Sequence, residues 1–577
     1  MAKSSKDRPE IDVAILGSGI AGTALAAVLS RQGAKVLILD AGTHPRFAIG
    51  ESTIPYTSML MRLVSERYDV PEIKHLTTFH NAQANVSPNG GIKKNFGFLY
   101  HREGEAQNPA ECHEFPIPKV THTENHFFRQ DLDAWVLNVA VKHGAQVRQY
   151  ARITDVQPDE QGITIISDKG EQWRSRFVVD ASGFRSPIAT KYGLREEPTR
   201  LRHHSRSIFT HMIGVTPYDD TVPKGIHGIS DTWHEGTLHH VFHGGWLWVI
   251  PFDNHPRATN PLVSIGLQLD PRIHPKVEGV TAEEEFRQFI DRFPSIRPQF
   301  ESAQAVREWI STARLQYSPK GTIGDRFCLT SHAAGFIDPL FSRGMSNTFE
   351  IINALSWRLL DALREDDFAV DRFEYVQQLE QRQLNFNDDL VANAYTSFSD
   401  YKLWDAWCRV WAMGQILSTM EINRAYAKFL NTHDASVLER LERIAPDGAL
   451  PEYEPMRTMY HEVVSTVQDV AEKRRSSGDA ADRIHELIKA ADFIPPFGLA
   501  DPNVRFYEGT PKVAFNALRW ARSDAAPDYI GKLVQEGLTL FIRHRFDRSE
   551  YNLAEEFRYA LAARPILGKR LRVPDPK

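Results

Sequence analysis

The sequence predicts an α/β (α+β) protein with a doubly wound βαβ domain, an antiparallel sheet and a helical C-terminal region. A buried strand, a glycine-rich turn and an alanine-rich helix follow one another over residues 11–32. Aromatic and β-branched residues dominate residues 203–270, as they do in sheets. Beyond residue 349, apolar residues recur at helical spacing.

Composition limits the kinds of partner. The chain has 577 residues, which is too long for one ordinary core, and its formal net charge of −6 offers no general attraction for nucleic acid. Cys112, Cys328 and Cys408 lack metal-ligand spacing, so neither a disulfide framework nor a metal site is predicted. No stretch reaches the roughly 18 apolar residues of a membrane helix, and the polar start lacks the apolar region of a signal peptide. We therefore expect a cytoplasmic protein with a small-molecule partner.

We expect the chain to divide into three parts. Residues 1–10 form a polar tail, residues 11–355 form the main core with a second sheet at about 200–275, and residues 356–577 form the helical region. Five helices are expected over residues 351–365, 373–393, 404–429, 453–475 and 480–491.

A dinucleotide-binding turn joins the first strand, residues 11–16, to the first helix, residues 21–32. Its glycines allow backbone N–H groups to approach a pyrophosphate at the helix N-terminus, and an acidic residue after the next strand, residues 35–39, can hold a ribose hydroxyl. The residues concerned are Gly17, Gly19, Ile20, Ala21, Gly22, Asp40 and Ala41. This pattern leaves FAD and NAD both open.

A second small-residue turn follows the alternating segment at residues 146–180. A strand that runs into small residues is typical of a cofactor contact, and the residues here are Asp180, Ala181, Ser182 and Gly183. Between the two turns, residues 84–120 indicate strands and loops, and residues 126–143 indicate a helix.

Two tryptophans mark the predicted central strand of the second sheet. Trp246 and Trp248 lie at i and i+2, so both side chains point to one face and can wall off one side of a cavity. Pro251 should end the strand, since it cannot donate to the ladder. The alternative interpretation is that both tryptophans are ordinary core residues.

Residues 46–55 and 128–133 favour FAD, because they look like the flavin-contacting segments of aromatic-hydroxylase-type monooxygenases. The residues concerned are Ile49, Gly50, Glu51, Ser52 and Arg129, although Arg129 could equally be a surface ion-pair residue. Such flavin sites usually carry a Gly-Asp pair later in the chain, where this sequence has Ser331-His332. That difference predicts weak, reversible flavin binding.

The stretches ILGSGIAG, IGESTIP, WLWVIP and GFIDPLFSRG, in this order and spacing, resemble the flavin-dependent halogenases over about the first 350 residues. Within that family the chain is most similar to the members of the chlortetracycline and pyrrolnitrin pathways, through GIKKNFGFLYH, REEPTRLRHHSRSIFTHM, FDNHP and SNTFEIINALSWRLLDALREDDFAV. These extend the resemblance to about residue 430. The implied fold is an FAD-binding domain of the aromatic-hydroxylase/halogenase type with a substrate-side sheet.

The resemblance implies that reduced FAD (FADH2) and O2 form a C4a-hydroperoxide, which a halide, chloride or bromide, converts to hypohalous acid. The implied halide site is the turn at Ser342, Arg343, Gly344 and Met345, after the flavin contacts Asp338 and Pro339; the alternative is a mere helix start. A lysine then presents the hypohalous acid to the substrate. Adjacent lysines on a strand face opposite sides, and the resemblance favours Lys93 over Lys94; on base rates alone both would be solvated charges.

The substrate side is expected between the tryptophan strand and the helical region. Candidates for the general base are Glu235, His239 and His240, and aromatic candidates for substrate contact are Phe98, Tyr395, Phe398, Trp404, Trp407 and Trp411. The tryptophan halogenases have a glutamate in the turn that here reads Pro-Leu-Phe-Ser at 339–342. Its absence argues for a more electron-rich ring than free tryptophan.

We therefore expect a two-component halogenase of an electron-rich aromatic secondary metabolite, namely a phenol, a tetracycline-like polyketide or a pyrrole. A separate NAD(P)H flavin reductase would supply FADH2, and the helical region could cover the pocket or form a homodimer interface. No nucleic acid, membrane or metal is expected. One alternative is an FAD-dependent aromatic hydroxylase, which needs no Lys93. Another is a non-catalytic binding protein that keeps the flavoprotein fold.

Overall fold

The βαβ unit lies at the centre of the first sheet of a computed structural model. The structure describes residues 9–117, 123–229, 231–438, 453–507 and 509–545, and residues 554, 557 and 561. Strand β1 (Ile11–Leu16) pairs in parallel with β2 and β10, and the sheet has the order β17-β18-β10-β1-β2-β7 with the β8–β9 hairpin beside β10. The bounds of its other strands are β2 Val36–Leu39, β7 Gln146–Arg148, β8 Ile153–Pro158, β9 Ile163–Ser167, β10 Gln172–Asp180, β17 Ile323–Gly324 and β18 Phe327–Leu329.

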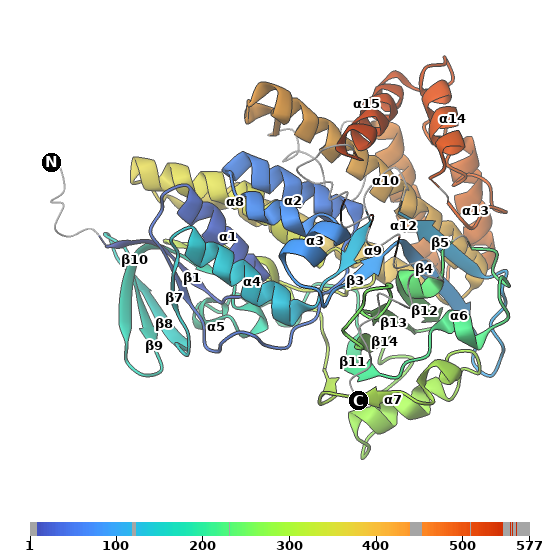
Figure 1. Cartoon of the computed structure of the whole chain (residues 1–577), viewed down its shortest axis with the longest axis horizontal. Helices are drawn as coiled ribbons and strands as arrows, with labels where there is room; N and C mark the ends of the chain where they lie inside the picture. The colour runs from blue at the N-terminus through green and yellow to red at the C-terminus, as the bar shows by residue number, and fades with distance from the viewer. Residues whose placement is uncertain are drawn as a thin grey trace.

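Helices cover one face of this sheet. Helix α1 (Ile20–Arg31) packs against α4 (Arg129–Lys142) and α8 (Gly344–Glu365), and its alanines allow this close approach (Figure 1). On the other face, Ala14 and Leu16 pack with Ile163 and Ile165 of the hairpin. Both faces of β1 are therefore buried from Val13 onward, which is why residues 13–16 form a continuous apolar run.

The second sheet has the order β15-β11-β14-β13-β12-β4-β5, so the tryptophan strand β13 (Gly245–Pro251) is central, as predicted. Strands β11 to β14 pair antiparallel, but β4 joins β12 in parallel, so the complete sheet is mixed. The bounds are β4 Asn95–His101, β5 Cys112–Pro116, β11 Arg206–Ile213, β12 Thr237–Phe242, β14 Val263–Leu269, β15 Gln304–Ala305 and β16 Ile310–Ser311. One face packs beneath α7 (Ala282–Ile290), and the other carries Trp246 and Trp248.

The expected helix at residues 126–143 begins only at Arg129. Residues 124–126 form strand β6 (Glu124–His126), which pairs antiparallel with β3 (Gly91–Lys93) in a small separate sheet. The prediction was wrong here because Glu124, Asn125 and His126 are polar and give no apolar alternation, although all three are buried.

The C-terminal helices share one hydrophobic core with the first domain. Buried residues of α1, α2, α8, α10 and α13 belong to the same cluster, and α10 packs against α2 (Figure 1). The expected boundary after residue 355 falls inside α8. The remaining helices are α2 Pro55–Tyr68, α3 Phe79–Asn85, α5 Pro187–Lys191, α6 Tyr218–Thr221, α9 Glu374–Ser397, α10 Tyr401–Thr432, α12 Glu454–Ala471, α13 Ser477–Ala490, α14 Pro511–Ala521 and α15 Asp528–Arg545.

Among the described residues, no helix is both long and apolar enough to cross a membrane. The three cysteines are buried and unpaired. Residues 1–8 of the expected N-terminal tail lie outside the described residues.

Candidate active site

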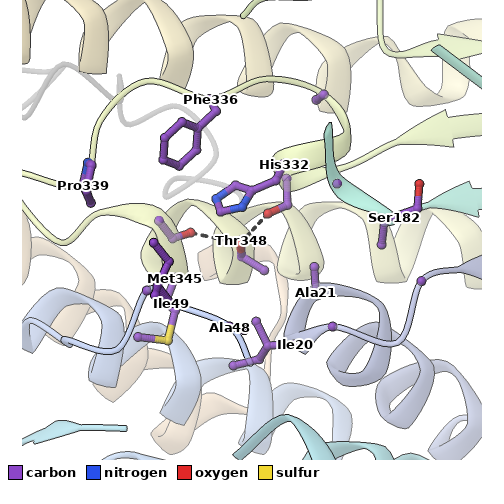
Figure 2. Close-up of a pocket in the computed structure, with 18 of the residues that line it drawn as sticks. Ile20, Ala21, Ala48, Ile49, Ser182, His332, Phe336, Pro339, Met345 and Thr348 are labelled. Atoms are coloured by element: carbon purple, nitrogen blue, oxygen red, sulfur yellow. Dashed lines mark hydrogen bonds between the residues drawn. The ribbon is translucent and has the colours of Figure 1, made fainter. Parts of the chain in front are cut away.

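A cavity of about 1050 Å³ lies between the two sheets and the start of α8. Its walls come from the first βαβ unit, the segment after β2, the turn after β10, the tryptophan face of the second sheet and the 331–345 turn. Figure 2 shows one part of it, with Ile20 and Ala21 facing His332 and Phe336 across the space. Segments far apart in the sequence therefore meet at one site.

The glycine-rich turn has the geometry of an anion cradle. Gly17 has a φ of +98°, and a Cβ at this position would lie 2.7 Å from the carbonyl oxygen of Ala181, so a side chain cannot be accommodated. Helix α1 has no side-chain cap, which leaves its first N–H groups free to meet a pyrophosphate. Gly17, Gly19, Ile20 and Ala21 line the cavity, whereas Gly22 packs behind the turn.

Asp40 is held as a carboxylate at the end of β2. It accepts hydrogen bonds from the Ser18 amide at 2.6 Å, the Gly42 amide at 2.7 Å and the Arg46 guanidinium at 2.7 Å and 3.0 Å. Burial opposes ionisation, but these donors keep the pKa of Asp40 well below its ordinary value. Asp40 and Ala41 both line the cavity.

Arg129 joins the start of α4 to the segment after β2. Its Nη1 donates to the carbonyl oxygens of Ile49 at 2.7 Å and Gly50 at 3.1 Å, while Nε and Nη2 bind the Asp133 carboxylate. Its side chain is only 11% exposed, so the surface interpretation is wrong. Arg129 fixes the loop that carries Glu51 and Ser52, and all five of the predicted residues Ile49, Gly50, Glu51, Ser52 and Arg129 line the cavity.

The 331–345 turn forms the opposite wall. Ser331 has a φ of +56°, and its hydroxyl bonds to the Thr348 hydroxyl at 2.8 Å, which turns His332 toward Phe336 (Figure 2). Burial lowers the pKa of His332 to about 4, so its imidazole is neutral at neutral pH. A neutral imidazole therefore stands where the aromatic-hydroxylase pattern has a carboxylate.

Asp338 lines the cavity, but its carboxylate already accepts hydrogen bonds from other groups of the protein. Oδ2 accepts hydrogen bonds from the Ser205 hydroxyl at 2.9 Å and the Tyr395 hydroxyl at 3.2 Å, and Oδ1 accepts from the Leu340 amide at 3.0 Å. This network shapes the turn that leads into α8. Pro339, Ser342, Arg343, Gly344 and Met345 also line the cavity, and α8 begins at Gly344 without a side-chain cap.

The turn after β10 presents Ala181, Ser182 and Gly183 to the cavity, but Asp180 lies behind it. Its fully buried carboxylate accepts hydrogen bonds from the Ser182 amide at 2.9 Å and the Ser186 hydroxyl at 2.7 Å. Asp180 therefore shapes the turn and does not reach the cavity.

Trp246 and Trp248 both line the cavity from β13, with ring centroids 5.6 Å apart. The indole N–H of Trp248 donates to the Ser264 hydroxyl at 3.2 Å. Gly266 lies opposite Trp248 on β14, and a Cβ there would come within 1.9 Å of the indole ring. The position of Trp248 therefore depends on a glycine on the neighbouring strand.

The two candidate lysines face opposite sides, as predicted. Lys93 is fully buried: Nζ donates to the Ser52 hydroxyl at 2.8 Å and the Thr53 carbonyl at 2.7 Å, and it lies 4.2 Å from the centre of the Phe96 ring. Desolvation lowers the pKa of Lys93 to about 7. Lys93 does not line the cavity itself, but Ser52 does, so one hydrogen bond separates the lysine from the cavity wall.

Lys94 instead pairs with Glu235 at 2.6 Å, and both side chains are about a quarter exposed. The structure thus places Glu235 away from the cavity. His239 does line the cavity; its Nδ1 bonds to the Gly97 carbonyl at 2.9 Å, and burial lowers its pKa to about 3. Its neighbour His240 points to the opposite side of the sheet, where it bonds to Gln299 at 2.7 Å.

The predicted substrate site contains six aromatic candidates, and all of them are buried in the main core and do not line the cavity: Phe98, Tyr395, Phe398, Trp404, Trp407 and Trp411. Phe98 stacks on His239 with centroids 4.7 Å apart and meets Trp404 edge-on. The aromatic candidates therefore support the cavity wall from behind. Apolar residues at helical spacing give the same sequence signal for a core and for a pocket, so the sequence could not separate the two.

Sequence reasoning missed several polar residues of the cavity. Arg46 lines the cavity and binds Asp40, whereas His211 lies behind the wall and binds the lining residue Glu51 at 2.8 Å. Ser207 and Gln268 lie opposite each other on β11 and β14 and line the cavity. Within the part of the chain that the structure describes, neither the Ser207 hydroxyl nor Gln268 Oε1 has a hydrogen-bond partner. Alternation within the strands could have indicated these inward positions. Among the described residues, no group of three His, Cys, Asp or Glu side chains could hold a metal ion.

Comparisons with known proteins agree with this geometry. Residues 10–264 match the family model described as FAD binding domain. The chain is 46% identical over 524 residues to the tetracycline 7-halogenase of Kitasatospora aureofaciens, which covers 90% of this chain and 94% of that protein. The chain belongs to the flavin-dependent halogenases.

Two further relatives support the assignment of this halogenase. Monodechloroaminopyrrolnitrin halogenase PrnC of Pseudomonas fluorescens is 47% identical over 493 residues, which is 85% of this chain and 86% of that protein. The crystal structure of halogenase PltM in complex with phloroglucinol and FAD superposes with a TM-score of 0.83 at 36% identity and covers 86% of this chain and all of that one.

The cavity of this halogenase fits FAD, its cofactor, which acts with halide and O2. The Gly17 cradle would take the pyrophosphate and Asp40 lies where the ribose would be held. The free polar atoms Ser207 Oγ, Gln268 Oε1, Arg343 Nε and Asn347 Oδ1 on the cavity wall are partners that a bound flavin and its reactants can use.

Proposed function

We propose that this halogenase places chlorine or bromine on a free, electron-rich aromatic secondary metabolite, a phenol, a tetracycline-like polyketide or a pyrrole, and that Lys93 carries the halogen. The observation that carries the proposal is the fully buried Lys93 one hydrogen bond behind the wall of the flavin cavity. The relatives act, by their names, on tetracycline and aminopyrrolnitrin compounds. Bound reduced FAD supplies the two electrons with which O2 and halide become hypohalous acid.

The chain holds the reactants in an order set by its own residues. Gly17 to Ala21, Asp40, the 49–52 segment and Ala181 to Gly183 bind the cofactor. The uncapped start of α8, with Ser342, Arg343, Gly344 and Met345 around it, binds the halide through backbone N–H groups and the guanidinium. Trp246 and Trp248 separate the substrate from the cofactor. Hypohalous acid must therefore move along the tryptophan face of the second sheet to reach the substrate.

We propose that His239 is the general base among the three candidates Glu235, His239 and His240. It lines the cavity, and it is neutral because burial lowers its pKa to about 3. Glu235 serves as the partner of Lys94. The substrate side of the cavity takes its shape from the aromatic residues packed behind its wall, Phe98, Tyr395, Phe398 and Trp404.

Flavin-dependent halogenases generally draw reduced flavin from a separate reductase and act on small aromatic molecules. We propose the same for this chain, with NAD(P)H as the reductant of the partner enzyme. Among the described residues we find one nucleotide-binding βαβ unit, and it is the one that fits FAD. A homodimer and a cytoplasmic location stay predictions.

The test compares Lys93→Met with Lys94→Met as its matched control. Each protein receives FAD, a flavin reductase, NADH, O2 and bromide, with tetracyclines, phenylpyrroles and simple phenols as substrates. We expect brominated products with the parent and Lys94→Met but a loss of at least about 100-fold with Lys93→Met, which is the lower range for removal of a catalytic group. Product masses and isotope patterns give the measurement.

Two results would contradict the proposal. Oxygenated products that persist in Lys93→Met would favour an aromatic hydroxylase, and a protein that takes up no FAD would favour a binding protein. Both variants should bind FAD and consume O2, which separates loss of halogen transfer from loss of the cofactor.

A further inference from the structure

Lys93 faces a second buried titratable group, Glu124, across the small β3–β6 sheet. The two residues are direct partners in the antiparallel register, where opposite Cβ atoms lie roughly 5 Å apart. Lys93 is fully buried and Glu124 is 3% exposed. Both residues lie outside the two large sheets. A buried acid opposite a buried amine is rare in proteins and often marks a functional site.

Glu124 is held by helix α2. Its Oε2 accepts a hydrogen bond from the Ser58 hydroxyl at 2.6 Å, and Arg62 on the same helix lies close enough to favour its ionised form. Nevertheless burial raises the pKa of Glu124, while burial lowers the pKa of Lys93 to about 7. Burial thus disfavours a fixed ion pair between the two groups, and among the described residues Lys93 has no ion pair within 4.0 Å.

The other titratable groups beside Lys93 are uncharged at neutral pH. His126 on β6 and His239 on β12 both face it, and burial lowers the pKa of each to about 3. Glu124 is consequently the charge to which Lys93 responds, with Arg62 behind it.

The hydrogen bonds of Lys93 match a neutral amine. A neutral amine has two N–H groups, and Nζ has two acceptors, the Ser52 hydroxyl and the Thr53 carbonyl. With both N–H groups engaged, the lone pair is left for reaction. An ammonium would leave its third N–H without an acceptor except the face of Phe96.

We propose that Glu124 is the positioning residue that, opposite Lys93 across the β3–β6 sheet, sets the pH at which Nζ meets hypohalous acid as a neutral nucleophile; this rests on the proposed function of Lys93. As the pH rises, the ammonium loses one proton to water, and the negative charge of the Glu124 carboxylate moves this loss to higher pH. The Nζ lone pair then forms a bond to the halogen while the halogen–oxygen bond breaks. The departing hydroxide takes one proton from Nζ, which releases water and leaves a haloamine on Lys93.

The test is the pH dependence of haloamine formation in Glu124→Gln. The full-length protein is dosed with hypobromous acid, quenched, and assayed for oxidising equivalents above those kept by Lys93→Leu. In the parent these should rise with pH around about 7, since only the neutral amine reacts. Removal of the carboxylate withdraws the charge that favours the ammonium, so the rise should move to lower pH by roughly one unit. Turnover with bromide should show the same shift.

Ser58→Ala is a second variant for the same measurement, in case Glu124→Gln fails to fold. Loss of the Ser58 hydrogen bond favours the protonated acid, so the rise should move in the same direction by less than in Glu124→Gln. Ser65→Ala is the matched control, because Ser65 is equally buried on α2 but donates to the Val70 carbonyl. It should leave the pH profile unchanged.

The outcomes separate the two proposals. An unshifted profile in Glu124→Gln and Ser58→Ala, or a parent whose haloamine falls as pH rises, would overturn the role of Glu124. A parent that keeps no more oxidising equivalents than Lys93→Leu at any pH would overturn the proposed role of Lys93 itself.

Discussion

At the scale of single residues, function in this halogenase depends on what lies one contact behind the cavity. Lys93 lies behind Ser52, and Trp248 keeps its place because Gly266 has no side chain. Asp180 and Asp338 accept hydrogen bonds from within the protein, and these bonds shape two turns. The shape of the cavity wall therefore depends partly on residues behind it, such as Gly266 and Asp180.

Gly266→Ala tests this dependence. The added methyl group overlaps the Trp248 indole, so the ring must move and the free energy of unfolding should fall by about 1–3 kcal/mol. We expect oxidant to escape from the cavity, with fewer halogenated product molecules per NADH consumed. Thermal unfolding and product yield measure the two effects.

Gly478→Ala is the control, since its nearest neighbour beyond the helix backbone lies 3.9 Å away. It should leave both quantities unchanged. Normal coupling of NADH to product in Gly266→Ala would show that the ring position does not matter.

At the scale of elements, α4 and the 49–52 segment act as one unit through Arg129. The βαβ unit, the central strand β13 and the C-terminal helices were all predictable, because each has a clear apolar period. The β3–β6 sheet was not, because its strands are short and its buried residues Lys93, Glu124 and His126 are polar. Lys93 itself was found through resemblance, and its partner Glu124 gave no signal at all.

Arg129→Gln tests the link between α4 and the loop. Two hydrogen bonds to loop carbonyls and the pairing with Asp133 are lost, so the loop should order less well around the cofactor. Charged hydrogen bonds contribute about 1.5–3 kcal/mol, and we expect the Kd for FAD to rise at least about tenfold. Quenching of flavin fluorescence on binding gives the Kd.

Arg148→Gln removes a surface pair with Glu171, whose arginine side chain is 52% exposed. It should leave the Kd for FAD unchanged, since such pairs contribute little. An equal Kd in Arg129→Gln and the parent would mean that the loop is held by other contacts.

At the scale of the whole molecule, buried neutral histidines make stability depend on pH. His126, His239 and His240 each have a pKa lowered by burial from 6.5 to about 3. Below pH 6.5 the unfolded chain binds protons that the folded one does not, so stability is complete above about pH 6.5 and is lost progressively as pH falls toward about 3. The slope should be about 1.4 kcal/mol per pH unit for each histidine.

Urea unfolding at a series of pH values measures this slope. His240→Gln, on the face of the sheet opposite the cavity, should have a smaller slope than the parent while FAD binding persists. A parent whose stability does not change between pH 6.5 and 5 would contradict the neutral state of these histidines.

The Asp338 network has a consequence for enzyme engineering. One carboxylate ties Tyr395 of α9, on the helical side, to the turn whose next residues surround the start of α8. A change on α9 made to admit a bulkier substrate would thus be transmitted to the loop for which we propose halide binding. Variants with altered substrate scope should therefore also be assayed for halide preference, because the Asp338 side chain connects the two regions.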